Sequence, residues 1–351
     1  MKMAFVSYAY SNRRMLGKDK LWMYGMGRYA TKIVETLSKM GFNVDVFSPK
    51  IYVKNVGPLA FTLENSLKNF DSYDIVHSNE ASGVFINHKN KIETFHHLSL
   101  QLGLKYRFFS SIQIMAIRNA KHIIVPSYAS KKSIMNLDKK IPDDKITVIY
   151  HGLDKQVFNS SNANKKLAEQ FRIRHSLTDH FVVINVGRLE KHKRQRDIIN
   201  AMADLKKSAL ILVGRGNEKK SLIDFAKKKG VQLLYFDYVP DAKLVVLYNA
   251  SDVYVHTSIL EGFGLTVLEA MACGLPIIAY KVADFDRIVK DAGYLMDIGD
   301  VNGIRSTLLI LRRDHDIRDK MSSVAVSHSK DFTWSKSARK HLDVYRRILD
   351  V

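Results

Sequence analysis

Two hydrophobic patterns alternate along the chain. Short apolar runs rich in β-branched residues predict strands, and longer segments with apolar residues three and four positions apart predict amphipathic helices such as 29–40 and 194–206. The first half contains six predicted strands, at residues 3–8, 43–47, 74–77, 92–95, 122–125 and 146–149. The second half contains six more, at residues 181–186, 209–213, 231–236, 252–255, 276–279 and 293–296. This alternation predicts parallel sheets covered by helices on both faces.

The two series of strands predict an α/β fold with two facing, doubly wound Rossmann-like domains. A length of 351 residues agrees with two domains, since a domain takes roughly 150 residues. The Asn-, Ser- and Lys-rich stretch 154–179 separates the two series, so we predict domains at 1–155 and 156–332 and a terminal helix within 333–351. Ligands of such sheets bind at the carboxyl ends of the strands, which places the expected site in a cleft between the domains.

The composition excludes several classes of protein. Apolar residues make up 46% of the chain and charged residues 26%, which is typical of folded globular proteins and not of disordered chains. The single cysteine, Cys273, excludes an intramolecular disulfide and a Cys-rich zinc site. No apolar run approaches the roughly 20 residues of a spanning helix. The first residues predict a strand and not a signal peptide, so we expect a cytoplasmic protein.

The charge balance is strongly basic and predicts an anionic partner. The chain has 55 Lys and Arg against 35 Asp and Glu, a net charge of +20. A basic amphipathic stretch at 98–121 is followed by lysine pairs at 131–132 and 139–140. Two interpretations remain open: a segment that docks on an anionic membrane surface and brings a lipid-linked acceptor to the cleft, or a core helix with a solvated basic face. Nucleic acid also fits the charge, but the cations are spread along the chain and no nucleic-acid-binding motif is present.

The most informative segment is 261–276, EGFGLTVLEAMACGLP. It predicts a turn after a strand and a short helix that begins near Leu265. Gly262 and Gly264 let the backbone approach a ligand, and the N-terminus of the helix attracts an anion. The carboxylates of Glu261 and Glu269 flank this turn and are suited to accept hydrogen bonds from hydroxyl groups. A phosphate between polyols describes a nucleotide sugar; a helix with a surface Glu at each end is the structural alternative.

This segment resembles the E-x7-E motif of the retaining GT-B glycosyltransferases of family 4 (glycosyl transferases group 1). The resemblance implies that Glu261 is a catalytic residue. It also implies that the segment binds the sugar-nucleotide donor through Gly262, Phe263, Gly264, Leu265 and Glu269.

Other segments of the second domain extend the resemblance. Gly187-Arg188 after a strand, with Lys193 five positions later, is similar to the family's two cations that hold the donor pyrophosphate. Two fixed cations at a strand end are also suited to stabilise a departing diphosphate, although such residues, taken alone, are more often solvated surface charges. The turn at Gly214 resembles the family's nucleotide-side glycine turn, and Val239 stands where the family's backbone meets the base.

The first domain carries a second glycine pattern. Gly25 and Gly27 precede a predicted helix and resemble the family's glycine-rich loop, which approaches the reaction centre. The pattern Gly-x-Gly-x-x-Ala ending at Ala30, with Asp45 as the ribose acid, is also a candidate dinucleotide fingerprint. That fingerprint follows its strand directly, whereas here a long basic stretch intervenes, so we prefer the first interpretation.

Two further segments resemble family motifs. Thr94 and His96 are similar to the family's Thr-x-His, which implies that His96 lies near the transferred sugar. The adjacent His97 makes the assignment ambiguous, and a buried, hydrogen-bonded histidine is the alternative. The sequence His-Gly-Leu-Asp at 151–154 resembles the family's Asn-Gly-Val-Asp hinge, and Phe-Thr-Trp at 332–334 resembles the entry to a helix that crosses back to the first domain.

The chain also departs from the family pattern. His-Thr-Ser at 256–258 replaces the usual Pro-Ser, Arg194 replaces a glycine, and the segment 282–286 replaces a Gly-Gly…Glu loop. Arg215 stands where an acidic residue is common. These changes fall in loops that choose the donor, so the sequence names neither the sugar nor the base.

The resemblance implies a retaining, metal-independent transfer of a hexose-type sugar. The donor is a nucleoside-diphosphate sugar of the UDP or GDP type, the acceptor is a hydroxyl of a glycan or of a lipid-linked molecule, and no cofactor or nucleic acid is expected. Three alternatives remain: a nucleic-acid-binding protein, a nicotinamide enzyme, and a catalytically silent relative that only binds nucleotide sugars. The expected location is the cytoplasm, with peripheral attachment to the inner face of the membrane as an open alternative.

Overall fold

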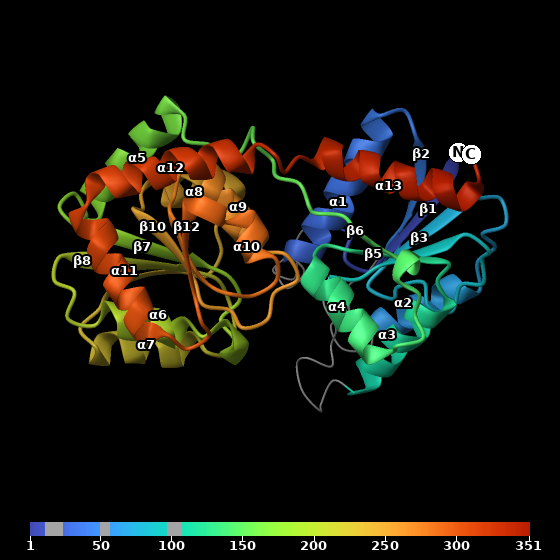
Figure 1. Cartoon of the computed structure of the whole chain (residues 1–351), viewed down its shortest axis with the longest axis horizontal. Helices are drawn as coiled ribbons and strands as arrows, with labels where there is room; N and C mark the ends of the chain where they lie inside the picture. Colours follow the sequence, from blue (N-terminus) through green and yellow to red (C-terminus); the bar gives the residue numbers. More distant parts are fainter. Residues whose placement is uncertain (11–23, 50–56, 97–106) are drawn as a thin grey trace. The chain divides into compact units, whose positions relative to one another are not determined.

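The computed structural model describes residues 1–10, 24–49, 57–96 and 107–351. The chain forms two compact units (Figure 1). Unit 1 comprises Met1–Gly152 and Thr333–Val351, and unit 2 comprises Leu153–Phe332. The first crossing between units therefore falls just before the expected boundary at residue 155. It falls there because the backbone of Gly152 packs against Trp334, while the N–H of Leu153 donates to the carbonyl of Phe332, 3.1 Å away.

Unit 1 contains a parallel sheet of six described strands in the order β2-β1-β3-β4-β5-β6. The strands are β1 (Lys2–Ser7), β2 (Asn43–Phe47), β3 (Ile75–Asn79), β4 (Lys91–Thr94), β5 (His122–Val125) and β6 (Ile146–Val148). The helices are α1 (Tyr24–Lys39), α2 (Gly57–Ser66), α3 (Arg107–Asn119), α4 (Tyr128–Leu137) and α13 (Trp334–Leu349), with the 3₁₀ turn η4 (Asp143–Lys145). Helices α1 and α13 pack together on one face of the sheet, and α2, α3 and α4 cover the other (Figure 1).

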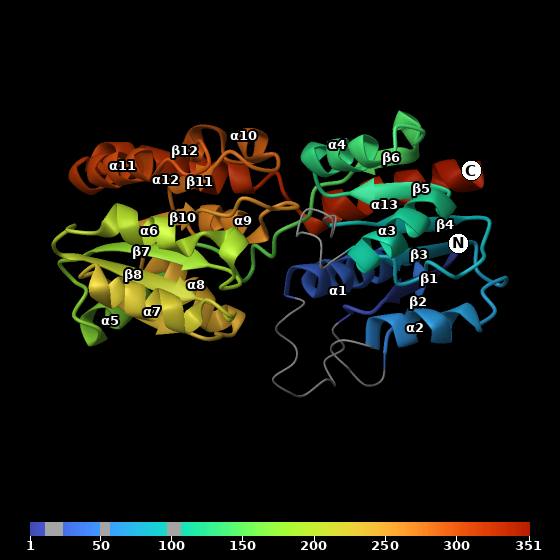
Figure 2. The ribbon, with the colours of Figure 1, turned by 90° about the horizontal axis from the view of Figure 1, so that it is seen from below.

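Unit 2 repeats the architecture with the strand order β12-β11-β10-β7-β8-β9 (Figure 2). The strands are β7 (Phe181–Val186), β8 (Ser208–Val213), β9 (Gln232–Phe236), β10 (Val253–His256), β11 (Ile277–Tyr280) and β12 (Gly293–Met296). The α-helices are α5 (Asn162–Arg174), α6 (Gln195–Met202), α7 (Lys219–Lys228), α8 (Asp241–Asn249), α9 (Leu265–Ala272), α10 (Phe285–Ile288), α11 (Val301–Arg313) and α12 (His315–Ser329). Short 3₁₀ turns are η5 (Lys191–Lys193) and η6 (Lys290–Ala292). Helices α6, α7 and α11 lie on one face, and α5, α8, α9 and α12 lie on the other.

Both strand orders contain a switch point, where successive connections leave a central strand in opposite directions. In unit 1 it lies between β1 and β3, and in unit 2 between β7 and β10. Loops that leave the carboxyl ends of two such strands diverge and open a space for a ligand. The segments that follow β7 and β10 carry the candidate donor residues, so the fold brings together what the sequence separates by about 70 positions.

All twelve predicted strands are present, with ends displaced by at most two residues. Strands β3 and β10 continue to Asn79 and His256, because polar residues continue the parallel pairing at these ends. Helix α6 ends at Met202 and not at residue 206, since Asp204 has a left-handed backbone conformation (φ +63°). The stretch 154–179 is not a plain linker: α5 forms within it and packs on α8.

The prediction for the glycines of the first domain needs a correction. They were expected in a loop before a helix that begins at Tyr29, but α1 begins at Tyr24, so Gly25 and Gly27 lie in its first turn. The N–H groups of a first turn have no partner within the helix; Gly25 is exposed and Gly27 is buried. The buried side chains of Tyr29 and Ile33 anchor the following turns.

Candidate active site

Hydrogen bonds from side chains and from the backbone join β7, β10 and the loops that follow them at the switch point of unit 2. The amide of Asn185 donates to the carbonyl of Val255 at 2.8 Å, which links the two strands near their ends. The hydroxyl of Thr257 donates to the carbonyl of Lys193 at 2.9 Å, and the N–H of Ile259 donates to the carbonyl of His192 at 2.9 Å. These bonds fix the position of Lys193 beside the segment that leads to Glu261.

Lys193 and Glu261 form an ion pair. The ammonium group of Lys193 donates to Oε1 of Glu261, and Nε2 of His256 lies 3.0 Å from the same oxygen. Both side chains of the pair are largely buried. Burial alone would raise the pKa of the Glu261 carboxyl, but the charge of Lys193 and the bond to His256 hold that pKa below its usual value. Glu261 is therefore an anion at neutral pH.

Arg188 takes a more exposed position than Lys193. Its side chain is 47% exposed and donates from Nη1 to Oε1 of Glu190 at 2.8 Å. Arg188 is thus a solvated cation with room to change partner when an anion arrives. Arg194, which replaces the family's glycine, has a left-handed backbone conformation (φ +49°), and its Nε donates to Asp197 at 2.6 Å.

The turn from Glu261 to α9 depends on one glycine. Gly264 has φ +93°, and a Cβ at this position would lie 2.5 Å from the ring of Phe285. The residue is also the N-cap of α9, which begins at Leu265 as the sequence predicts. Glycine lets the chain turn sharply, and as at any helix start the N–H groups that precede Val267 have no intrahelical partner. An anion at this position would meet N–H donors and the positive end of the helix.

Glu269 lies deeper than the sequence suggests. The residue is 1% exposed, and its Oε2 accepts a hydrogen bond from the hydroxyl of Tyr248 at 3.1 Å. Its carboxylate lies on α9, eight positions after Glu261 along the chain. The buried position excludes the alternative of a helix with a surface Glu at each end.

The glycine turn after β8 packs directly against the loop after β7. Gly214 has φ +150°, and a Cβ there would lie 1.8 Å from the carbonyl oxygen of Gly187. No side chain fits at this contact, so glycine is a requirement of the packing. Val239 is buried just before α8, and its neighbour Tyr238 is exposed. The structure thus brings the glycine turn to the switch point.

In unit 1, His96 lies at the end of β4 in a buried polar cluster. Its Nε2 is 3.0 Å from Oδ1 of Asn79, and its Nδ1 is 3.1 Å from Nε2 of His151. The amide of Asn79 donates to Oγ of Ser7 at 3.1 Å across the switch point between β1 and β3, which orients its oxygen toward His96. His96 is therefore a donor at Nε2 and an acceptor at Nδ1, provided the ring is neutral.

A second chain of hydrogen bonds runs behind His96. The hydroxyl of Tyr29 lies 3.1 Å from Oγ1 of Thr94 and 2.8 Å from Nε2 of His341 in α13. Oγ1 of Thr94 also lies 2.7 Å from Nε2 of His77, whose Nδ1 is 2.6 Å from the hydroxyl of Tyr345. Burial lowers the pKa of His77 well below its usual value and that of His341 to about 4. These rings are neutral at pH 7.

Part of the sequence prediction lies outside the described residues. This applies to His97 and to residues 98–106 of the basic amphipathic stretch. The described end of that stretch exposes Arg118 and Lys121 and buries Ile117. Within the described residues, every helix is too short or too polar to span a bilayer.

No group of three metal-ligating side chains is found in the described parts of the chain. An Asp-x-Asp spacing, which is a common metal-binding pattern, occurs at 284–286 and 314–316. Asp314 caps α12, where its Oδ1 accepts from the N–H of Ile317 at 2.9 Å. The carboxylate of Asp314 therefore serves to cap α12.

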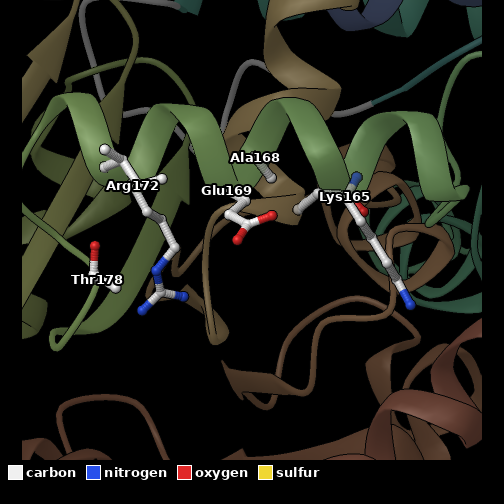
Figure 3. Close-up of a pocket in the computed structure, with 7 residues that line it drawn as sticks. Lys165, Ala168, Glu169, Arg172 and Thr178 are labelled. Atoms are coloured by element: carbon white, nitrogen blue, oxygen red, sulfur yellow. The ribbon is translucent and has the colours of Figure 1, made fainter.

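A groove of ≈ 270 Å³ lies elsewhere in unit 2, along α5 (Figure 3). Lys165, Glu169 and Arg172 project from successive turns of α5 into it. Arg172 is paired with Asp252. None of the predicted donor residues lines this groove.

Sequence reasoning did not find the residues that hold the predicted ones in place. These are Asn79 and His151 around His96, and Tyr248, Tyr254 and His256 around the two glutamates. The sequence could have pointed to two of these residues, His151 and His256, because both stand at positions where the chain departs from the family pattern.

Comparison with known proteins identifies the class. The structure superimposes on sucrose-phosphate synthase from Thermosynechococcus elongatus with a TM-score of 0.83, 19% identity, and coverage of 99% of both chains. It also superimposes on HepE from Anabaena in complex with UDP-glucose, with a TM-score of 0.75, 22% identity, and coverage of 98% of this chain and 99% of the other. The two Rossmann-like units therefore form a GT-B fold.

Sequence comparison identifies the family. Residues 23–157 match the family model Glycosyltransferase Family 4, and residues 168–326 match the family model Glycosyl transferases group 1. The chain is 28% identical over 274 residues to O-antigen chain mannosyltransferase B of Escherichia coli, a match that covers 73% of this chain and 70% of that protein. This chain belongs to the family 4 glycosyltransferases, and the predicted fold, family and enzyme class are confirmed.

Proposed function

We propose that this enzyme is a retaining, metal-independent glycosyltransferase. It moves a hexose-type sugar from a nucleoside-diphosphate sugar of the UDP or GDP type to a hydroxyl of a glycan or of a lipid-linked acceptor. The observation that carries the proposal is the buried Lys193–Glu261 pair beside the N-terminus of α9, at the switch point of unit 2. The UDP-glucose in the complex of the similar Anabaena protein supports the donor class.

The donor site follows from the chemistry of these groups. Lys193, Arg188 and the first N–H groups of α9 supply positive charge for the diphosphate. As the bond to the sugar breaks, negative charge grows on the diphosphate, and fixed donors lower the energy of that state. The same cations supply charge stabilisation that a bound metal ion provides in other transferases, which supports metal independence. Glu261 and Glu269 are suited to accept hydrogen bonds from hydroxyls of the sugar and the ribose.

The residues of unit 1 are proposed to serve the sugar and the acceptor. His96 follows β4 at the carboxyl edge of the sheet, and Gly25, which is exposed, and Gly27 lie in the first turn of α1. The retaining outcome rests on the resemblance of 261–269 to the family's E-x7-E motif.

A variant series tests the proposal. Glu261→Ala should abolish transfer in a screen over UDP- and GDP-sugars while circular dichroism shows a folded protein. Lys281→Ala, in an exposed ion pair with Asp297 (3.1 Å), is the matched control and should keep full activity. Unchanged turnover in Glu261→Ala would overturn the assignment. Stabilisation by a nucleotide sugar without any transfer would identify a silent relative, and stabilisation by oligonucleotide or NAD would identify another class.

We also propose peripheral attachment of unit 1 to an anionic membrane surface on the cytoplasmic side. Unit 1 has 27 Lys and Arg against 13 Asp and Glu, whereas unit 2 has 28 against 22. The positive excess is therefore concentrated in unit 1, as a surface that meets anionic lipid requires. Flotation with anionic and neutral liposomes at two salt concentrations tests this, and binding that depends on neither lipid charge nor salt would contradict it.

A further inference from the structure

His256 is a buried polar residue at the end of β10 that the proposed function leaves without a role. The residue is 3% exposed, and its Nε2 lies 3.0 Å from Oε1 of Glu261. Lys193 keeps the Glu261 carboxyl ionised, and an ionised carboxylate only accepts hydrogen bonds. Nε2 of His256 therefore carries the proton of this bond, whether the ring is neutral or charged.

The other side of the His256 ring is also held. Its Nδ1 lies 3.2 Å from the hydroxyl of Tyr254, and that hydroxyl lies 2.8 Å from Oγ1 of Thr266 in the first turn of α9. Tyr254 is fully buried, so these bonds form away from water. The ring cannot rotate without breaking bonds on both sides. His256 thus connects β10, α9 and the carboxylate that precedes α9.

Both protein contacts to Glu261 converge on one oxygen. Lys193 and His256 both donate to Oε1, and within the described residues no hydrogen bond reaches Oε2. Two donors from different directions fix the plane of a carboxylate, whereas one donor leaves it free to rotate. A fixed carboxylate with one unused oxygen is prepared to accept from a ligand at Oε2.

We propose that His256 is a positioning residue for the donor sugar. It holds Glu261 by Oε1 so that Oε2 meets a hydroxyl group of the sugar, and it does not touch the donor itself. This inference rests on the proposed function and deepens it, because it assigns recognition of the sugar, as distinct from the diphosphate, to the His256–Glu261 pair.

The test compares a nucleotide sugar with its free nucleoside diphosphate. UDP-glucose, UDP, GDP-mannose and GDP are titrated calorimetrically into the wild type, His256→Ala, His256→Gln and His328→Ala. We expect His256→Ala to weaken binding of the nucleotide sugar about tenfold and binding of the nucleoside diphosphate by less than about twofold. The variant loses the bond that orients Glu261, and only the sugar depends on that orientation. A Gln amide offers an N–H at similar reach, so His256→Gln should restore most of the affinity. His328 lies on α12, and His328→Ala is the control for loss of an imidazole.

A spectroscopic readout separates this inference from the proposed function. Nitrogen-15 shifts of His256 in the free wild type should show a protonated Nε2 throughout the neutral pH range. An unprotonated Nε2, equal losses of sugar and diphosphate affinity in His256→Ala, or no rescue by His256→Gln would each overturn the inference. If no nucleotide sugar bound to the wild type, the proposed function and the sugar-recognition step would both fail. A protonated Nε2 would then still support the link to Glu261.

Discussion

The buried polar cluster of unit 2 is charged, whereas the histidines of the buried polar cluster of unit 1 are neutral. In unit 2, Lys193 and Glu261 form a buried ion pair, and the pKa of Glu261 lies below its usual value despite burial. In unit 1, burial lowers the pKa of His77, His151 and His341, so these imidazoles are neutral at pH 7. One cluster contains an ion pair, and in the other these three imidazoles are neutral.

This difference between the two clusters matches the charges that develop on the diphosphate and on the sugar in the proposed reaction. Negative charge grows on the leaving diphosphate, so fixed cations lower the barrier there. Positive charge grows on the sugar, and a protonated histidine near it would raise the barrier. Neutral imidazoles supply hydrogen bonds and shape without that repulsion. We infer that burial in unit 1 serves to keep the cluster around His96 uncharged.

Removal of the cation from unit 2 should have the largest effect. Lys193→Met leaves Glu261 buried without its main counter-charge, so the pKa of Glu261 should rise. Transfer should fall at least about 100-fold at pH 7, as for loss of a group that stabilises developing charge. The remaining kcat/KM should increase with pH as Glu261 ionises, over a range where the wild-type profile is flat. A Lys193→Met profile parallel to the wild type would contradict the linkage.

The sequence predicts the strands and the donor turn because both are local patterns. Residues 181–186 contain five apolar residues and one Asn, and they form β7 as predicted. The segment that begins at Glu261 encodes its own turn and helix, so its geometry follows from neighbouring residues. The same holds for the helix that begins at Trp334.

The histidine cluster of unit 1 could not be predicted in this way. Tyr29, His77, Thr94 and His341 come from four segments, and only the pairing of β3 with β4 and the docking of α13 on α1 bring them together. Each residue alone is typical of a strand end or a helix. The partners of His256, Tyr254 and Glu261, lie two and five positions away in the sequence. Thr266, which bonds to the Tyr254 hydroxyl behind the His256 ring, lies on another element, α9.

A second prediction concerns the neutral cluster. The pKa of His341 is about 4 in the folded state because of burial, against about 6.5 when unfolded. A histidine with a lowered folded pKa contributes stability at neutral pH that is lost as the pH falls from 6.5 toward 4, here about 3 kcal/mol. His341→Gln cannot titrate, so its unfolding free energy should fall less on acidification. Urea unfolding at pH 7.5 and 5, followed by tryptophan fluorescence, measures this.

The control for the acid effect is His315→Gln, at an exposed position in unit 2. It should leave the loss of stability on acidification unchanged. An equal acid-induced loss in wild type and His341→Gln would show that the charge state of the cluster does not limit the stability of unit 1.

The titration of Glu93 should make unit 1 less stable as the pH rises, which is opposite to the effect of His341. It is fully buried on β4 beneath α3, and burial raises its pKa to about 8 despite the opposing charge of Lys91. A raised folded pKa means that the stability present below the unfolded pKa of about 4.5 is lost as the pH rises through 8. The unfolding free energy of Glu93→Gln should therefore rise relative to that of the wild type by about 3 kcal/mol between pH 6 and pH 9. The decisive observation is this pH-dependent change in the difference between the two stability curves, and parallel curves would exclude a titrating Glu93.

The smallest expected effect lies in the loop of unit 2 where the chain departs from its family. Arg194 adopts φ +49°, which costs a non-glycine residue about 1 kcal/mol. Its side chain offsets part of that cost through the 2.6 Å bond from Nε to Asp197, which also accepts from Tyr280. Arg194→Gly relieves the backbone and removes the bond, so stability should change by less than about 1 kcal/mol. Because η5 still places Lys193 against Glu261, kcat/KM should stay within about twofold, whereas a loss as large as that of Lys193→Met would show that Arg194 belongs to the charged cluster that distinguishes unit 2.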